Sequence, residues 1–273
     1  MRSIYKIEIL RGFESIGFKV SLVLGCGITL LQWITSVVPI ALQQELYMNS
    51  DFAMCYPANV YNNWIGANTY LFSYLYFLLI PLLAALPHGS SFYSDIHHYF
   101  IQNICIRVEK KHYYIAKYLS VFLTGGITVV LPLIFNYMLT SALLPIIRPQ
   151  AADYTSLIGI GSTFGDFFFK HPMQYVCVFA IIIFIAGGIY ATYALIGTYY
   201  TENVFIVLSI PFIFVAFLNS IASLFGAPDW QSVFFLNPGY NGDRVPPIIV
   251  QTVGLAAISL YVFVVKGSKE DIC

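Results

Sequence analysis

The sequence predicts an all-α integral membrane protein with six transmembrane helices. Only 10% of the 273 residues are charged and the mean hydropathy is +0.76, whereas a soluble domain has about 25% charged residues. The charged residues also leave long gaps between them, and a helix needs about 20 mostly apolar residues to cross a bilayer. Six stretches of at least that length contain no Asp, Glu, Lys or Arg: Val20–Gln44, Phe52–Ser94, Tyr118–Ile147, His171–Thr201, Asn203–Pro228 and Val245–Val265.

Continuous helices are expected in these stretches, because backbone polar groups in lipid must be satisfied within their own segment. The predicted spans are residues 18–42, 70–87, 114–140, 172–198, 204–225 and 247–265. The segments between them are short, so residues 1–273 are predicted to form one transmembrane domain. Residues 1–17 are expected to form a helix on the inner surface, although their apolar positions spiral around it.

The basic residues orient these spans, because cytoplasmic loops accumulate Lys and Arg. With the N-terminus inside, ten of the 13 basic residues lie on the inner side. The other three are Arg148, Lys170 and Arg244, in the outer loops. Both termini are therefore predicted to be cytoplasmic, as expected for a multi-pass protein of a plasma membrane.

The sequence predicts neither an ion-coupling site nor a catalytic site within the membrane. All 13 acidic residues lie outside the predicted spans, and Lys19 and Lys117 lie at inner edges, where a lysine can extend its amine to water. An ion-driven transporter normally keeps ionisable groups at membrane depth. Motifs of metalloproteases, serine proteases and ATP-binding loops are absent, so no catalytic, cofactor-binding or metal site is predicted. The formal net charge is zero, which gives nucleic acid no basic surface to bind.

The inner loop between the second and third predicted spans, residues 89–112, has an amphipathic pattern. Its apolar residues recur at spacings of three and four: Phe92, Ile96, Tyr99, Phe100 and Ile104. Ser94, Asp95, His98 and Gln102 fall on the opposite side. This pattern predicts one short helix along the inner membrane surface. Such a helix can anchor the loop among lipid headgroups or serve as a docking surface for a cytoplasmic partner.

A sequence pattern in and beyond this loop carries a family resemblance. It consists of Leu86-Pro87-His88-Gly89-Ser90-Ser91-Phe92, Asp95, Asn103, Arg107, Lys110-Lys111-His112-Tyr113 and Ala116-Lys117-Tyr118. It resembles the type 2 ATP-binding-cassette permeases of Gram-positive bacteria, as do the outer segment Val60–Asn68 and the pair His171-Pro172. Those permeases typically read Leu-Pro, a small residue, Ser-aromatic, an acidic residue, a Gly, then Asn, Arg, Lys-Lys-x-Tyr and Ala-Lys. The chain departs from this pattern at Asp95, where Glu is usual, and at Tyr99, where the family has Gly.

The resemblance implies a bacterial permease half that pairs with a second, identical or related half and with a cytoplasmic ATPase subunit. ATP and magnesium would bind to that ATPase, so this chain would not itself be an enzyme. The helix between spans two and three would be the coupling helix, which fits a groove of the ATPase. The residues that the resemblance implies for this contact are Asp95, His98, Tyr99, Gln102, Asn103, Arg107, Lys110 and Lys111.

Charge-free spans suit a hydrophobic or amphipathic substrate, such as an antimicrobial peptide or a lipid-like molecule. The expected function is therefore the permease subunit of an exporter, and the same scaffold could serve self-immunity. One alternative is a membrane scaffold or sensor subunit that transports nothing. Another is an intramembrane enzyme, for which the polar candidates Gln32, Asn136 and Asn219 are isolated in the sequence.

Overall fold

The computed structural model of the chain describes residues 2–45, 49, 54–106, 109–240 and 242–267, and these contain helices but no strand. The first half contains α1 (Arg2–Glu14), α2 (Ile16–Gln32), η1 (Trp33–Val37), α3 (Val38–Leu42), α5 (Val60–Asn63), η2 (Ile65–Ala67), α6 (Leu71–Ala85), α7 (Ser91–His97), α8 (Phe100–Cys105) and α9 (Lys110–Leu143). The second half contains α10 (Gly165–Lys170), α11 (Pro172–Gly197), α12 (Val204–Leu224), η3 (Pro228–Trp230), α13 (Ser232–Leu236), α14 (Val245–Leu260) and η4 (Tyr261–Lys266).

Five helical segments of the described chain are long and apolar enough to cross a membrane, which indicates a multi-pass membrane protein. They are Ile16–Leu42, Lys110–Leu143, Pro172–Gly197, Val204–Leu224 and Val245–Lys266, close to five of the predicted spans. The remaining predicted span, residues 70–87, is α6. With 15 residues, α6 is shorter than the about 20 that a bilayer requires. The described chain therefore has five candidate spans, whereas six were predicted.

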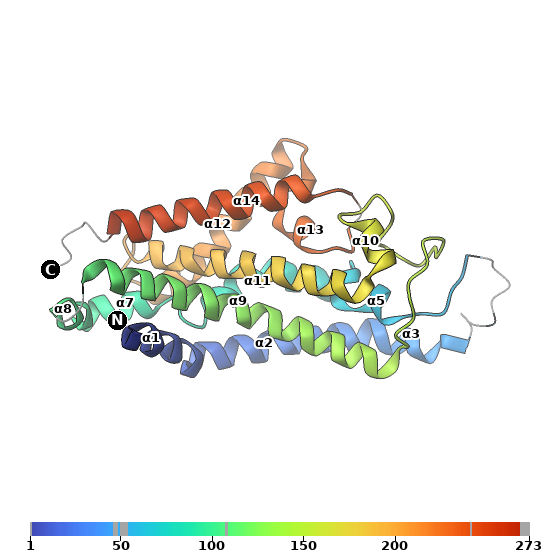
Figure 1. Cartoon of the computed structure of the whole chain (residues 1–273), viewed down its shortest axis with the longest axis horizontal. Coiled ribbons are helices and arrows are strands. Elements are labelled where there is room, and N and C mark those ends of the chain that lie inside the picture. The colour runs from blue at the N-terminus through green and yellow to red at the C-terminus, as the bar shows by residue number, and fades with distance from the viewer. Residues whose placement is uncertain (1, 46–48, 50–53, 107–108, 241, 268–273) are drawn as a thin grey trace.

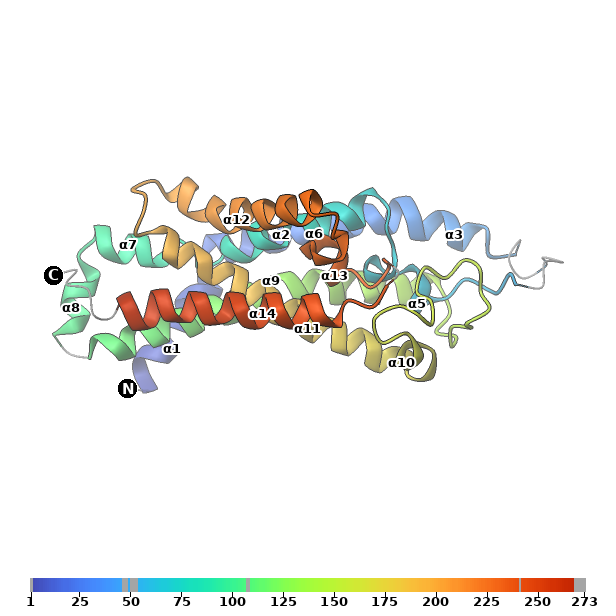
Figure 2. The same ribbon diagram turned by 90° about the horizontal axis from the view of Figure 1, so that it is seen from above.

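The helices lie roughly parallel in an elongated bundle (Figures 1 and 2). Its centre is the pair α9 and α11, which pack against each other. α9 also contacts α1, α2 and α6, and α11 also contacts α6, α12 and α14. α1, α7, α8 and the end of η4 lie at one end of the bundle, and α5 and α10 lie at the other (Figure 1). Both ends of the described chain are thus on the same side of the bundle as the inner loop.

Glycines allow α9 and α11 to approach closely. A Cβ atom at Gly125 would lie 2.5 Å from the Cβ of Ala191 and 2.9 Å from the carbonyl oxygen of Ala84. A Cβ atom at Gly187 would lie 2.5 Å from Cγ2 of Val129. Small residues on facing helices let membrane helices pack with their backbones close together. Gly125 and Gly187 allow this close packing between α9 and α11 of the same chain.

We expect Gly125→Leu to lower the midpoint of thermal unfolding in detergent, because the added side chain must push α9 away from α6 and α11. Overpacking of this kind typically costs about 1–3 kcal/mol. The control is Gly27→Leu on α2, since a Cβ atom at Gly27 meets nothing within 4 Å. Equal midpoints for the two variants, followed by circular dichroism, would contradict this packing.

Candidate functional site

The N-terminal helix α1 is part of the helical bundle. It packs against α9 and α2, and a Cβ atom at Gly12 would lie only 2.5 Å from Cγ2 of Thr124 on α9. Ser15 follows the last residue of α1 and is the N-cap of α2. Its hydroxyl accepts a hydrogen bond from the Phe18 amide at 3.0 Å. The same hydroxyl donates to the carbonyl oxygen of Pro87 at 2.6 Å. The junction of α1 and α2 is therefore fixed to the turn that follows α6.

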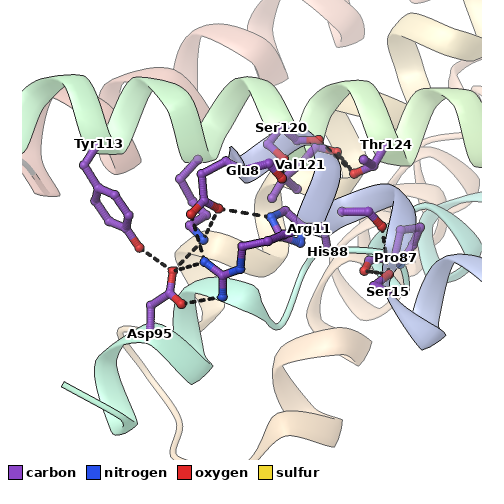
Figure 3. A network of polar contacts seen from close by, with 12 residues as sticks. Glu8, Arg11, Ser15, Pro87, His88, Asp95, Tyr113, Ser120, Val121 and Thr124 are labelled. Carbon is purple, nitrogen blue, oxygen red and sulfur yellow. Dashed lines mark hydrogen bonds and ion pairs between the residues drawn. The ribbon is translucent and has the colours of Figure 1, made fainter. Parts of the chain in front are cut away.

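A buried network of charged side chains forms where α1, α7 and α9 meet (Figure 3). Arg11 donates to Glu8 at 2.8 Å and to Asp95 at 2.9 Å. The amine of Lys117 forms ion pairs with both of these carboxylates. Glu8, Asp95 and Lys117 are 1%, 2% and 0% exposed, respectively, whereas Arg11 is 37% exposed. Two acids thus alternate with two bases, and each carboxylate contacts both cations.

Hydrogen bonds complete this network. The hydroxyl of Tyr113 donates to Asp95 at 2.6 Å, and the hydroxyl of Ser120 donates to the backbone carbonyl of Glu8 at 2.7 Å. Nε2 of His88, which is 4% exposed, lies 3.3 Å from Oε2 of Glu8. Burying charges is costly unless they are paired and hydrogen-bonded. This arrangement meets both conditions, so it can hold three segments of the chain in fixed relation.

The surroundings lower the pKa values of both Glu8 and His88. Burial alone would raise the pKa of Glu8, but the hydrogen bond with His88 and the charges of Lys117 and Arg11 together lower that pKa to about 2. Burial also lowers the pKa of His88. At neutral pH we therefore assign a charged Glu8 and a neutral His88, whose Nε2–H donates to the carboxylate.

The inner loop is also held by an aromatic cluster. Phe92 on α7 is fully buried, and its ring centroid lies 4.9 Å from that of Phe263, 5.5 Å from Tyr114 and 5.8 Å from Tyr199. These partners belong to η4, to α9 and to the turn after α11. α7 is thus fixed by charged contacts through Asp95 and by apolar contacts through Phe92.

The predicted single helix over the inner loop is wrong: the structure has two short helices, α7 and α8. Tyr99 separates them in the left-handed conformation, with φ of +55°. Phe92 and Ile101 are both buried, yet nine residues of a straight helix make about two and a half turns and would place them on opposite sides. The break allows both to be buried.

The residues expected to face a partner fall into separate groups in the structure. His98, Tyr99, Gln102, Asn103 and Lys111 are exposed, and Lys110 is half-buried. Arg107 lies outside the described residues. Asp95 faces Arg11, Tyr113 and Lys117 inside the chain, because its charge is balanced there rather than at the surface. The expectation that Asp95 faces outward therefore does not hold in this structure.

The prediction that Lys117 reaches water at the membrane edge is also wrong, because α1 covers it and supplies Glu8 as its partner. The predicted site residues do not include Glu8, Arg11, His88 or Lys117. Glu8 and Arg11 carry opposite charges three residues apart, which is a signal for one helix face. Nothing local indicates that this face meets α9, 109 residues further along the chain.

A second polar cluster, formed by α2 and α9, joins two residues that are isolated in the sequence. Nδ2 of Asn136 donates to Oε1 of Gln32 at 2.8 Å and to the carbonyl of Thr29 at 3.0 Å, while its Oδ1 accepts from the amide of Ile65 at 2.9 Å. The third candidate, Asn219, instead hydrogen-bonds Ser232 at 3.1 Å. The side chains of Gln32 and Asn136 bind each other and the backbone, which is a structural role.

No group of three or more His, Cys, Asp or Glu side chains able to hold a metal ion occurs among the described residues. Comparisons of the chain with protein-family models, curated proteins and solved structures find no match.

Proposed function

We propose that this chain is the membrane-spanning permease subunit of an ATP-binding-cassette exporter, powered by a separate cytoplasmic ATPase subunit. The observation that carries the proposal is the buried network of Glu8, Arg11, Asp95 and Lys117. It fixes the inner loop to α9, the longest helix of the described chain. A push on the inner loop is thereby transmitted to the centre of the bundle.

The docking surface for the ATPase consists of His98, Tyr99, Gln102 and Asn103, which are exposed at the tip of the inner loop. Tyr99 is 69% exposed, and tyrosine is enriched at protein interfaces because it offers both an apolar ring and a hydroxyl. The surface begins three residues after Asp95, so a partner that moves it also moves the network.

The proposed permease crosses the membrane six times and pairs with a second half. α6 serves as the sixth crossing, both termini are cytoplasmic, and a second permease half completes the pathway. The pathway is expected to be apolar and to suit a hydrophobic or amphipathic substrate, because the buried side chains of Gln32 and Asn136 hydrogen-bond each other. Energy comes from the ATPase, since the charged groups of the network are already paired with one another.

The test reconstitutes the chain with a candidate ATPase in proteoliposomes and measures substrate-stimulated ATP hydrolysis. We expect the double variant Gln102→Ala/Asn103→Ala to lower this stimulation about tenfold, equivalent to about 1.4 kcal/mol of contact energy. Its thermal unfolding should match that of the wild type, because both side chains are exposed.

A matched control is Asp166→Ala/Lys170→Ala, which removes two exposed side chains from α10 at the opposite end of the bundle. This control should keep full stimulation. Substrate movement into sealed vesicles by this chain alone, or equal stimulation in both double variants, would overturn the proposal.

A further inference from the structure

A groove of about 430 Å³ lies between α12 and α14. Small-molecule sites in proteins typically occupy about 300–1,000 Å³. Of the residues that line the groove, all are apolar except Gln251, and they include Leu218, Ala222, Phe225, Trp230 and Leu255. Both helices are candidate membrane spans, and the groove residues Phe225, Val250 and Ile258 are exposed, so the groove opens at the surface of the bundle.

The groove has an apolar floor and one polar end. Ala222 and Leu255 are buried in its floor. At the end near η3, the side-chain amide of Gln251 donates to the carbonyl of Trp230. Tryptophan is enriched where the hydrocarbon core meets the headgroups. Beside it, Asp229 pairs with Arg244 at 2.9 Å and remains 56% exposed. The polarity thus falls from η3 along α14, as it does along a phospholipid from headgroup to tail.

Gly254 makes room for an occupant. Val250 and Ile258, one turn before and after it on α14, also line the groove. A Cβ atom at Gly254 would meet no atom within 4 Å. Any other residue at this position would place its side chain in the open space. The distance from Gln251 to Ile258 along the helix is about 10 Å, which suits an extended chain.

We propose that this groove binds one acyl chain of a phospholipid from the surrounding bilayer, with the headgroup at the Trp230 end. The ligand class follows from the lining, which offers only apolar contacts between Gln251 and Ile258 along α14. The lipid then fills the space between α12 and α14, both of which pack on α11. This site does not depend on the proposed transport function.

The test measures quenching of tryptophan fluorescence by phosphatidylcholine with brominated acyl chains, with the chain reconstituted in vesicles. The Trp230 signal is the difference between wild type and Trp230→Phe. We expect the series Gly254→Ala, Leu and Phe to reduce the quenching of this signal progressively, to less than half of the wild-type value for Phe. The matched series at Gly27, where a Cβ atom also meets no atom within 4 Å, should leave the quenching unchanged.

A second measurement is native mass spectrometry after purification in mild detergent with added phosphatidylcholine. The wild type and Gly27→Phe should each retain one phospholipid more than Gly254→Phe. Equal quenching of the Trp230 signal in the Gly254 and Gly27 series, or equal lipid retention, would overturn the proposal. Circular dichroism of each variant establishes that the helices are intact.

Discussion

Replacing Lys117 with Met should strongly destabilise the chain. Lys117 is fully buried and contacts both Glu8 and Asp95, so its loss leaves two buried carboxylates with Arg11 as their shared cation. Breaking a buried ion pair by removing one partner costs about 3–5 kcal/mol. The midpoint of thermal unfolding in detergent, followed by circular dichroism, measures the effect. Lys111→Met is the control, because Lys111 is exposed on the same helix.

A second substitution tests whether charge balance is the cause. Glu8→Gln alone should lower the stability of the wild type, since it leaves the cations in excess. In the Lys117→Met background, the same substitution should raise the stability, because one carboxylate and Arg11 then remain as a balanced pair. Residues in one ion-pair network are coupled in this way, and a double-mutant cycle measures the coupling. Additive effects of the two substitutions would show that the network does not act as a unit.

Acidification should destabilise the wild type, because Glu8 and His88 of the same network have lowered pKa values in the folded chain. The folded chain holds the pKa of Glu8 at about 2, against an ordinary value of 4.5. Between these values the unfolded state binds a proton that the folded state does not, so stability falls as the pH is lowered. The difference corresponds to about 3 kcal/mol. The lowered pKa of His88 acts with the same sign and begins at higher pH, below about 6.5.

The measurement is the thermal midpoint as a function of pH from 7 to 3. We expect Glu8→Gln to have a smaller loss of stability than the wild type between pH 5 and pH 3, because the titrating group is gone. Glu109→Gln should keep the wild-type dependence, since the Glu109 side chain is 77% exposed. Identical curves for Glu8→Gln and the wild type would exclude Glu8 as the source.

The helices near the predicted spans could be found because each depends on a local property of the sequence. A charge-free stretch such as Asn203–Pro228 predicts a helix in lipid by itself, and α12 begins at Val204 and ends at Leu224. α6 agrees less well, because the charge-free stretch Phe52–Ser94 is long enough for several arrangements. Its residues also form α5, η2 and the start of α7.

The inner loop shows where the local pattern fails. Spacings of three and four predict one amphipathic face, but they do not show that Asp95 has cationic partners from α1 and α9. With those partners, Asp95 is buried beside Phe92, and the helix must break before Ile101 can be buried as well. The pattern assigned Asp95 to water because the partners come from distant parts of the chain.

The sequence alone determined that this is a helical, multi-pass membrane protein, because hydrophobic length and the absence of charge are properties of single segments. Only the tertiary structure decided which charged residues pair, since Glu8, Asp95 and Lys117 meet only when α1, α7 and α9 pack together. It likewise decided that Gly125 and Gly187 join α9 to α11 within one chain, and that Gly254 faces open space. Contacts between distant segments have no signature in either segment by itself.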